Sequence, residues 1–205
     1  MTVPLMFQPL VKYAQFEGRS RRSEFWLWIL FRFLLNQLMG AVALAFIGPM
    51  FADFGLHPDA INAHPEIFFQ NYMTMWMRIL PFFSVISLAL LVPTLTVAVR
   101  RLHDINRTGW WVVLPYGVMI VGVIIFLVIG GVSIFNLFAA HPNGNVSDAE
   151  GIRTLVQVIG SMFLCVVLPA LIAWIVLLVF FVTEGTRGPN RFGPDPKASL
   201  QPEVL

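Results

Sequence analysis

The sequence predicts an all-α integral membrane protein, a bundle of four transmembrane helices, from two observations. Charged residues make up 12% of the 205-residue chain and hydrophobic residues 58%, whereas soluble domains carry about 25% charged residues. The low charge leaves four continuous apolar blocks, each long enough, at about 1.5 Å per residue, to cross roughly 30 Å of hydrocarbon. The blocks are residues 25–47, 79–99, 110–130 and 160–182. Because they do not alternate with polar residues, we expect helices rather than barrel strands.

Residues 3–16, VPLMFQPLVKYAQF, precede the first block and place Phe7, Leu10, Val11 and Ala14 at helical spacing. This pattern favours a short amphipathic helix on the membrane surface that ends at Gly18. A partly ordered tail is the alternative, because the segment is short and interrupted by proline.

The first block resembles a secretory signal only superficially. It follows the basic stretch RSRR, but a signal core spans roughly 7–15 apolar residues and this block is far longer. Arg32 and Asn36 lie within it, on one helical face with Gly40. We predict a retained transmembrane helix whose intramembrane polar residues, Arg32 and Asn36, point into the bundle.

The segments outside the second and fourth blocks carry helix signals of their own. Pro65 suits a first helical turn, so the second helix can start as far out as PEIFFQNYMTMWMR. Ser147 and Glu150 have the spacing of a capping box, which predicts an early start for the fourth helix. Three prolines are expected to interrupt helices two, three and four. They are Pro93, Pro115 and Pro169.

The basic residues are distributed asymmetrically between the two ends of the predicted bundle. Of the 13 Lys and Arg residues, most fall in the N-terminal segment, in the connection between helices two and three, and in the C-terminal tail. These are Lys12, Arg19, Arg21, Arg22, Arg100, Arg101, Arg107, Arg187, Arg191 and Lys197. By the positive-inside rule this end is cytoplasmic. We therefore predict that both termini are cytoplasmic.

The domain organisation is expected to be simple. Residues 1–196 form a single membrane domain and residues 197–205 a flexible C-terminal tail, because no repeat or second domain is visible. The one cysteine, Cys165, excludes an intrachain disulfide and a cysteine-cluster zinc site. No metal site and no cofactor are predicted. The pI near 9.0 follows from the asymmetric charge, so nucleic acid is not expected as a partner.

Three motifs lie at the predicted cytoplasmic face: FEGRSRRSEFW at 16–26, RRLHDINRTGWW at 100–111 and GTRGPNRFGPDP at 185–196. Their arginines would repel one another unless acids or a bound anion lie among them. We expect the motifs to fold together into a polar cap with Glu24 and Asp104 as internal counter-ions. The predicted anion- or partner-binding residues are Arg19, Arg21, Arg22, Glu24, Arg101, His103, Asp104, Asn106, Arg107, Asn190 and Arg191.

On these three motifs the chain resembles the YhaH-type bacterial inner-membrane proteins, a family catalogued as a domain of unknown function. The resemblance runs from about Phe16 to Pro196. It implies a small four-helix protein of the bacterial inner (cytoplasmic) membrane. It brings no catalytic residue, cofactor or substrate with it.

The sequence leaves three functions open. The first is a cap that binds anionic membrane lipid, or a membrane or cytoplasmic protein partner, including a second copy of the chain. The second is a small transporter or oligomeric channel that uses Arg32, Asn36 and a Ser/Thr face on helix two. The third is an enzyme acting on lipid headgroups through His103 and Asp104, which is the weakest because no further catalytic residue is apparent.

Overall fold

The computed structural model describes residues 3–56 and 65–198. Within these ranges the regular structure is helical apart from one isolated β-bridge. The elements are η1 Leu5–Phe7, α1 Gln8–Val11, α2 Arg22–Leu56, α4 Pro65–Asp104, η2 Gly109–Val113, α5 Leu114–Ala140, α6 Asp148–Met162, η3 Phe163–Val167 and α7 Leu168–Val182. Four helical stretches of the described chain are long and apolar enough to span a membrane, which confirms the predicted class. They are Arg22–Phe46, Tyr72–Asp104, Gly109–Ala140 and Asp148–Val182.

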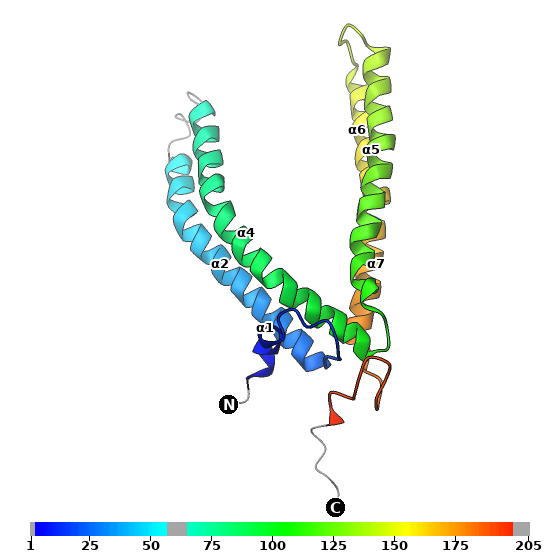
Figure 1. Ribbon diagram of the computed structural model, residues 1–205. Coiled ribbons are helices and arrows are strands. Elements are labelled where there is room, and N and C mark those ends of the chain that lie inside the picture. The colour runs from blue at the N-terminus through cyan, green and yellow to red at the C-terminus, as the bar shows by residue number, and fades with distance from the viewer. Residues whose placement is uncertain (1–2, 57–64, 199–205) are drawn as a thin grey trace, which may run out of the picture.

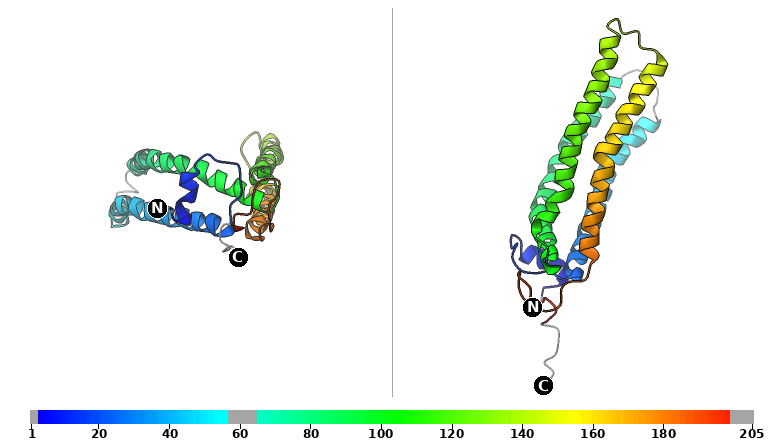
Figure 2. Two further views of the ribbon diagram at one scale, coloured as in Figure 1. Left: turned by 60° about the horizontal axis from the view of Figure 1, so that its bottom comes forward. Right: turned by 90° about the vertical axis from the view of Figure 1, so that its right-hand side faces the viewer.

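The helices form two antiparallel hairpins that spread apart from a common base. One hairpin is α2 with α4, and the other is α5 with the continuous α6–η3–α7 helix (Figures 1 and 2). The hairpins meet where α4 and η2 lie against the end of α7, and the N- and C-terminal segments lie at this same base. Lipid chains are as apolar as the helices, so no hydrophobic driving force closes the outer ends.

The base also holds the apolar core. Its members come from the start of α2, the end of α4, η2 and the end of α7, so one cluster links both hairpins. The buried residues are Phe25, Trp28, Val97, Ala98, Leu102, Val112, Leu177 and Phe181. Farther from the base most large apolar side chains are exposed, as expected of surfaces that face lipid.

Both outer helix starts lie where local signals place them. Helix α4 begins at Pro65. The amide of Glu150 donates to Ser147 Oγ at 3.4 Å, and the Glu150 carboxylate accepts from the Ser147 amide at 3.4 Å. The predicted capping box is therefore confirmed, and α6 begins directly after it at Asp148.

The N-terminal segment is ordered against the first hairpin, although its helix is shorter than predicted and ends at Val11. Phe7 packs edge-on against Phe31 of α2, with ring centroids 5.4 Å apart. The Tyr13 hydroxyl donates to the Ala89 carbonyl of α4 at 2.6 Å. That carbonyl has no partner within the helix, because residue 93, four positions on, is a proline without an N–H.

The other two prolines behave differently. Contrary to the prediction, Pro115 does not interrupt the third helix. It lies in the first turn of α5, where the missing N–H costs no helical hydrogen bond. Pro169 follows the π-helical turn η3 inside the fourth helix. Pro169 has no N–H to donate to the Cys165 carbonyl four residues earlier, and Gly122 in α5 packs against that carbonyl with no room for a Cβ.

Candidate functional site

The three basic motifs meet at the base of the molecule and form what we call the basic cap, residues 18–24, 100–107 and 183–197. Backbone hydrogen bonds join them directly. The Ser20 amide donates to the Arg100 carbonyl at 3.0 Å, and the Thr186 amide donates to the Asp104 carbonyl at 2.9 Å. The end of α4 is thus flanked on one side by the N-terminal segment and on the other by the C-terminal segment.

Asp104 is the centre of the basic cap. One carboxylate oxygen accepts from Arg19 Nε at 3.0 Å, and the other accepts from Arg101 Nη1 at 2.5 Å. All three side chains are at most 6% exposed. Other guanidinium N–H groups donate to main-chain carbonyls. Arg19 donates to Thr186 and Gly188 of the C-terminal segment, and Arg101 donates to Phe181 at the end of α7 and to Thr183 just after it. The expectation that Asp104 acts as an internal counter-ion is confirmed.

Glu24 is the second internal counter-ion, as predicted. Its carboxylate lies 3.2 Å from Arg100 Nη2, and both side chains are almost fully buried. This pair is less well satisfied than the first. Within the described chain Glu24 Oε1, Arg100 Nε and Nη2, and the nearby Ser20 hydroxyl have no hydrogen-bond partner. Buried charges with unsatisfied N–H and O atoms are costly, so this pair contributes less to stability than a fully hydrogen-bonded one.

His103 and Asn106 shape the end of α4. Asn106 adopts a left-handed conformation with φ of 60°, and the Arg107 amide donates to the Leu102 carbonyl at 2.9 Å. This is a Schellman ending, which Asn tolerates better than most residues. The His103 ring stacks on Phe192 with centroids 3.9 Å apart, and its Nδ1 lies 3.2 Å from the Gly18 carbonyl.

His103 and Asp104 do not form the base and orienting acid that the enzyme hypothesis requires. The imidazole Nδ1 contacts a carbonyl, and the carboxylate is occupied by two arginines. Adjacent positions in a helix point in different directions, so the pairing in the sequence does not become a pairing in space.

Asn190 and Asp195 fold the C-terminal segment back onto the basic cap. Asn190 Nδ2 donates to the His103 carbonyl at 2.9 Å, and the Asn190 amide exchanges backbone hydrogen bonds with Gly193. The Asp195 carboxylate accepts from the amides of Lys197 and Gly188 at 2.9 and 3.1 Å. These hydrogen bonds lower the pKa of Asp195, with a smaller contribution from the charges of Arg19 and Lys197.

The remaining predicted arginines lie on the surface of the basic cap. Arg107 stands over the rings of Trp111 and Phe180, at 5.9 and 5.3 Å from the centroids. Arg191 stands 4.6 Å over Phe192 and donates to the Asn106 carbonyl at 3.1 Å. Arg22 reaches the exposed carboxylate of Glu184 at 3.5 Å. Arg21 is half-buried, and within the described chain it and Arg107 have no acidic partner within 4 Å.

The predicted residues therefore divide into two groups. Arg19, Arg101 and Asp104 are internal and hold the cap together, whereas Arg107 and Arg191 are exposed and Arg21 is half-buried. Sequence reasoning missed Arg100, Thr186 and Gly185 as members of the internal group. The sequence marks these three residues only as members of the basic and Gly-rich motifs, and membership of a motif does not indicate which side chains are buried.

Of the two intramembrane polar residues, only Arg32 forms a hydrogen bond to another helix within the described chain. Arg32 Nη1 donates to Thr94 Oγ1 of α4 at 3.3 Å, and Trp28 Nε1 donates to the same oxygen at 3.1 Å. Asn36 is exposed, so the expectation that it also points inward is wrong. Ser84 donates to the carbonyls of Leu80 and Pro81 in its own helix, as serine in a helix commonly does.

In the described part of the chain, no group of three or more His, Cys, Asp or Glu side chains is placed to hold a metal ion. His57, Asp59 and His64 lie outside the described residues.

These features define a class: a polytopic helical membrane protein whose two hairpins are joined by a basic cap. The chain belongs to the family described as "Protein of unknown function (DUF805)", which matches residues 13–194. It is 29% identical to "Inner membrane protein YhaI" of Escherichia coli (strain K12), over 92% of this chain and 91% of the relative. It is 24% identical to "Inner membrane protein YhaH" of the same strain, over 92% of each chain. No solved structure matches it.

Proposed function

We propose that the protein lies in the bacterial inner membrane with the basic cap and both termini in the cytoplasm, and that the cap binds the headgroups of anionic lipids. The carrying observation is Arg107. Its guanidinium is exposed and stands over two aromatic rings rather than beside a carboxylate. Arginine held in this way keeps its N–H groups free for a phosphate.

The division of the arginines supports the same function. Each buried arginine is paired with Asp104 or Glu24, and Arg19 and Arg101 also donate to main-chain carbonyls, so their guanidinium groups are engaged within the fold. The exposed members, Arg107 and Arg191, are held over aromatic rings at the base of the hairpins. Each Lys or Arg near an anionic membrane surface contributes about 1 kcal/mol of binding.

The cytoplasmic placement of the basic cap rests on the positive-inside rule. The chain segments at the opposite ends of the hairpins carry few cations: Arg78 and Arg153 accompany Glu66, Asp148 and Glu150. An even number of spans places both termini on one side, and both terminal segments lie at the base.

Lipid binding is tested by extracting the protein into native lipid discs and quantifying the co-purified lipids by mass spectrometry. In the Arg107→Ala/Arg191→Ala protein we expect the enrichment of anionic lipid over the bulk membrane to fall about thirtyfold, from about 1 kcal/mol for each of the two arginines. Arg153→Ala is the matched control, since it removes an exposed arginine from the opposite end. Unchanged enrichment in the double variant would refute lipid binding, and loss of a co-purified protein instead would identify a protein partner.

Orientation is tested separately with single cysteines in a Cys165→Ala background. We expect a membrane-impermeant maleimide added to spheroplasts to label Asn143→Cys, at the outer turn between α5 and α6, and not Arg187→Cys in the basic cap. Both positions are exposed. The reverse labelling pattern would place the basic cap on the other side of the membrane.

A further inference from the structure

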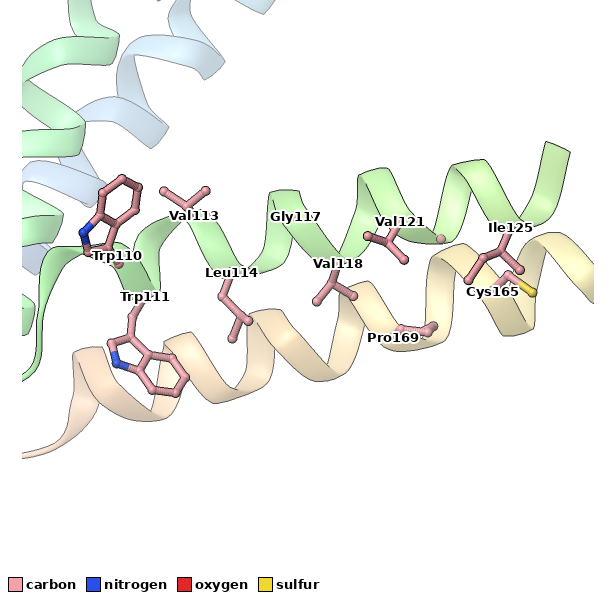
Figure 3. Close-up of a pocket in the computed structure, with 11 residues that line it drawn as sticks. Trp110, Trp111, Val113, Leu114, Gly117, Val118, Val121, Ile125, Cys165 and Pro169 are labelled. Atoms are coloured by element: carbon pink, nitrogen blue, oxygen red, sulfur yellow. The ribbon is translucent and has the colours of Figure 1, made fainter. Parts of the chain in front are cut away.

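A groove runs along the second hairpin between α5 and α7, and Figure 3 shows the side chains that line it. Its volume is about 710 Å³, within the roughly 300–1,000 Å³ of small-molecule sites. Its lining is almost entirely apolar and extends from Trp110 and Trp111 at the base to Ile125 and Cys165. At about 1.5 Å per residue, Trp111 to Ile125 spans roughly 20 Å, which exceeds the roughly 15 Å of one leaflet's hydrocarbon.

Two glycines of α5 create the groove. Gly122 packs against the Cys165 carbonyl, so the two helices are held in close contact at this level. Gly117 also lines the groove, one and a half turns nearer the base, and a Cβ there would meet no atom within 4 Å. The missing side chain at Gly117 leaves a hollow in an otherwise apolar, lipid-facing surface.

The mouth of the groove carries a positive charge. Trp111 lines the groove and also lies beneath the guanidinium of Arg107, which has no acidic partner within 4 Å in the described chain. One end of the site is therefore cationic and exposed, and the rest is apolar. This polarity matches a molecule with an anionic head and a long apolar chain.

We propose that this groove binds one acyl chain of an anionic phospholipid whose headgroup phosphate pairs with Arg107. The inference rests on the proposed function and adds a defined binding site for a single lipid molecule. Within a bilayer the chain gains no hydrophobic free energy by leaving its neighbours, so it is held by packing against the groove wall. The charge at Arg107 then selects the anionic head, and the groove fixes where the lipid sits.

The test uses phosphatidylglycerol with a diazirine in the middle of one acyl chain, reconstituted with the full-length protein in lipid discs. After irradiation, the cross-linked peptides are mapped by mass spectrometry. We expect cross-links to concentrate on residues 114–125 and 163–169 and to be displaced by unlabelled phosphatidylglycerol but not by phosphatidylcholine. Uniform labelling of all lipid-facing helix surfaces, or equal displacement by both lipids, would overturn the proposal.

A matched pair of variants tests the groove independently of the headgroup. Gly117→Leu fills the hollow, whereas Gly131→Leu adds the same side chain to open space on α5 outside the groove. We expect the groove cross-link to be lost in the first variant, because leucine occupies the space of the acyl chain, and to stay unchanged in the second. Suppose that the enrichment of anionic lipid falls in Arg107→Ala but the yield of the groove cross-link is unchanged in Gly117→Leu. The groove is then refuted as the binding site of the acyl chain, and headgroup binding by the basic cap stands. If Arg107→Ala changes neither the enrichment of anionic lipid nor the yield of the cross-link, both headgroup binding and the groove site are refuted.

Discussion

Gly185 lies directly against the carboxylate of Asp104, so that a Cβ at position 185 would overlap the carboxylate oxygens. This contact lets the C-terminal segment pass close enough for the Thr186 amide to bond the Asp104 carbonyl. The absence of a side chain at Gly185 is thus a condition for closing the basic cap.

Gly185→Ala is expected to destabilise the protein by about 1–3 kcal/mol, as overpacking of a well-filled site does. Gly131→Ala is the control, because its added methyl meets nothing within 4 Å and alanine favours the helix. Thermal unfolding of the purified proteins in detergent measures both. Equal transition temperatures would show that the segment 183–189 moves aside without cost.

Asp104→Asn should cost about 3–5 kcal/mol, because it leaves the buried guanidinium groups of Arg19 and Arg101 without a counter-charge. Glu184→Gln is the matched control. It removes a carboxylate whose pairs with Arg22 and Lys197 are exposed, for which a change of about 0–1 kcal/mol is usual. Titration with a denaturing detergent compares them, and similar losses in both would contradict the central role of Asp104.

Gly122→Ala is expected to push α5 away from the Cys165 carbonyl and to lower stability by about 1–3 kcal/mol. Gly117→Ala, five residues earlier on the same helix, has open space at its Cβ and should be neutral. The comparison again uses thermal unfolding. A neutral Gly122→Ala would mean that the second hairpin tolerates a wider separation of its helices.

Tyr13→Phe is expected to cost about 1 kcal/mol, because it removes the hydroxyl that satisfies the Ala89 carbonyl. In a Pro93→Ala background the carbonyl regains an N–H within the helix, so the same change should have little effect. A double-mutant cycle measures this coupling. Additive losses would show that Tyr13 does not compensate for Pro93.

The closure of the C-terminal segment should weaken in acid. The hydrogen bonds from the Lys197 and Gly188 amides lower the pKa of Asp195 from its ordinary value of 3.8, so the ionised carboxylate favours the closed segment. That contribution is complete above pH 3.8 and is lost as the pH falls from there through the lowered pKa. Hydrogen exchange at the two amides, corrected for the intrinsic rate, should show the loss in the natural protein. Asp195→Asn should remove the dependence on pH, and an identical pH profile in that variant would assign the transition to another group.

The helical elements were largely predictable because their signals are local. Apolar length identifies the four spans, and the side chains of Ser147 and Glu150 satisfy the first amides of α6 without help from distant residues. The failure at Pro115 has a local cause as well. The preceding η2 turn postpones the start of α5, and this places the proline where a helix accepts it.

The sequence by itself determined the class of protein, the end of the bundle at which the basic residues gather, and Glu24 and Asp104 as the acids among them. Only the tertiary structure decided which arginine has which role. Positions 19 and 21 are both arginine and lie only two residues apart. Arg19 is nevertheless buried against Asp104, whereas Arg21 is half-buried and has no acidic partner in the described chain. The difference arises because Asp104 and the carbonyls of Thr186 and Gly188 come from segments far along the chain. Residue type and spacing set the charge, whereas burial depends on which distant groups the fold places beside it.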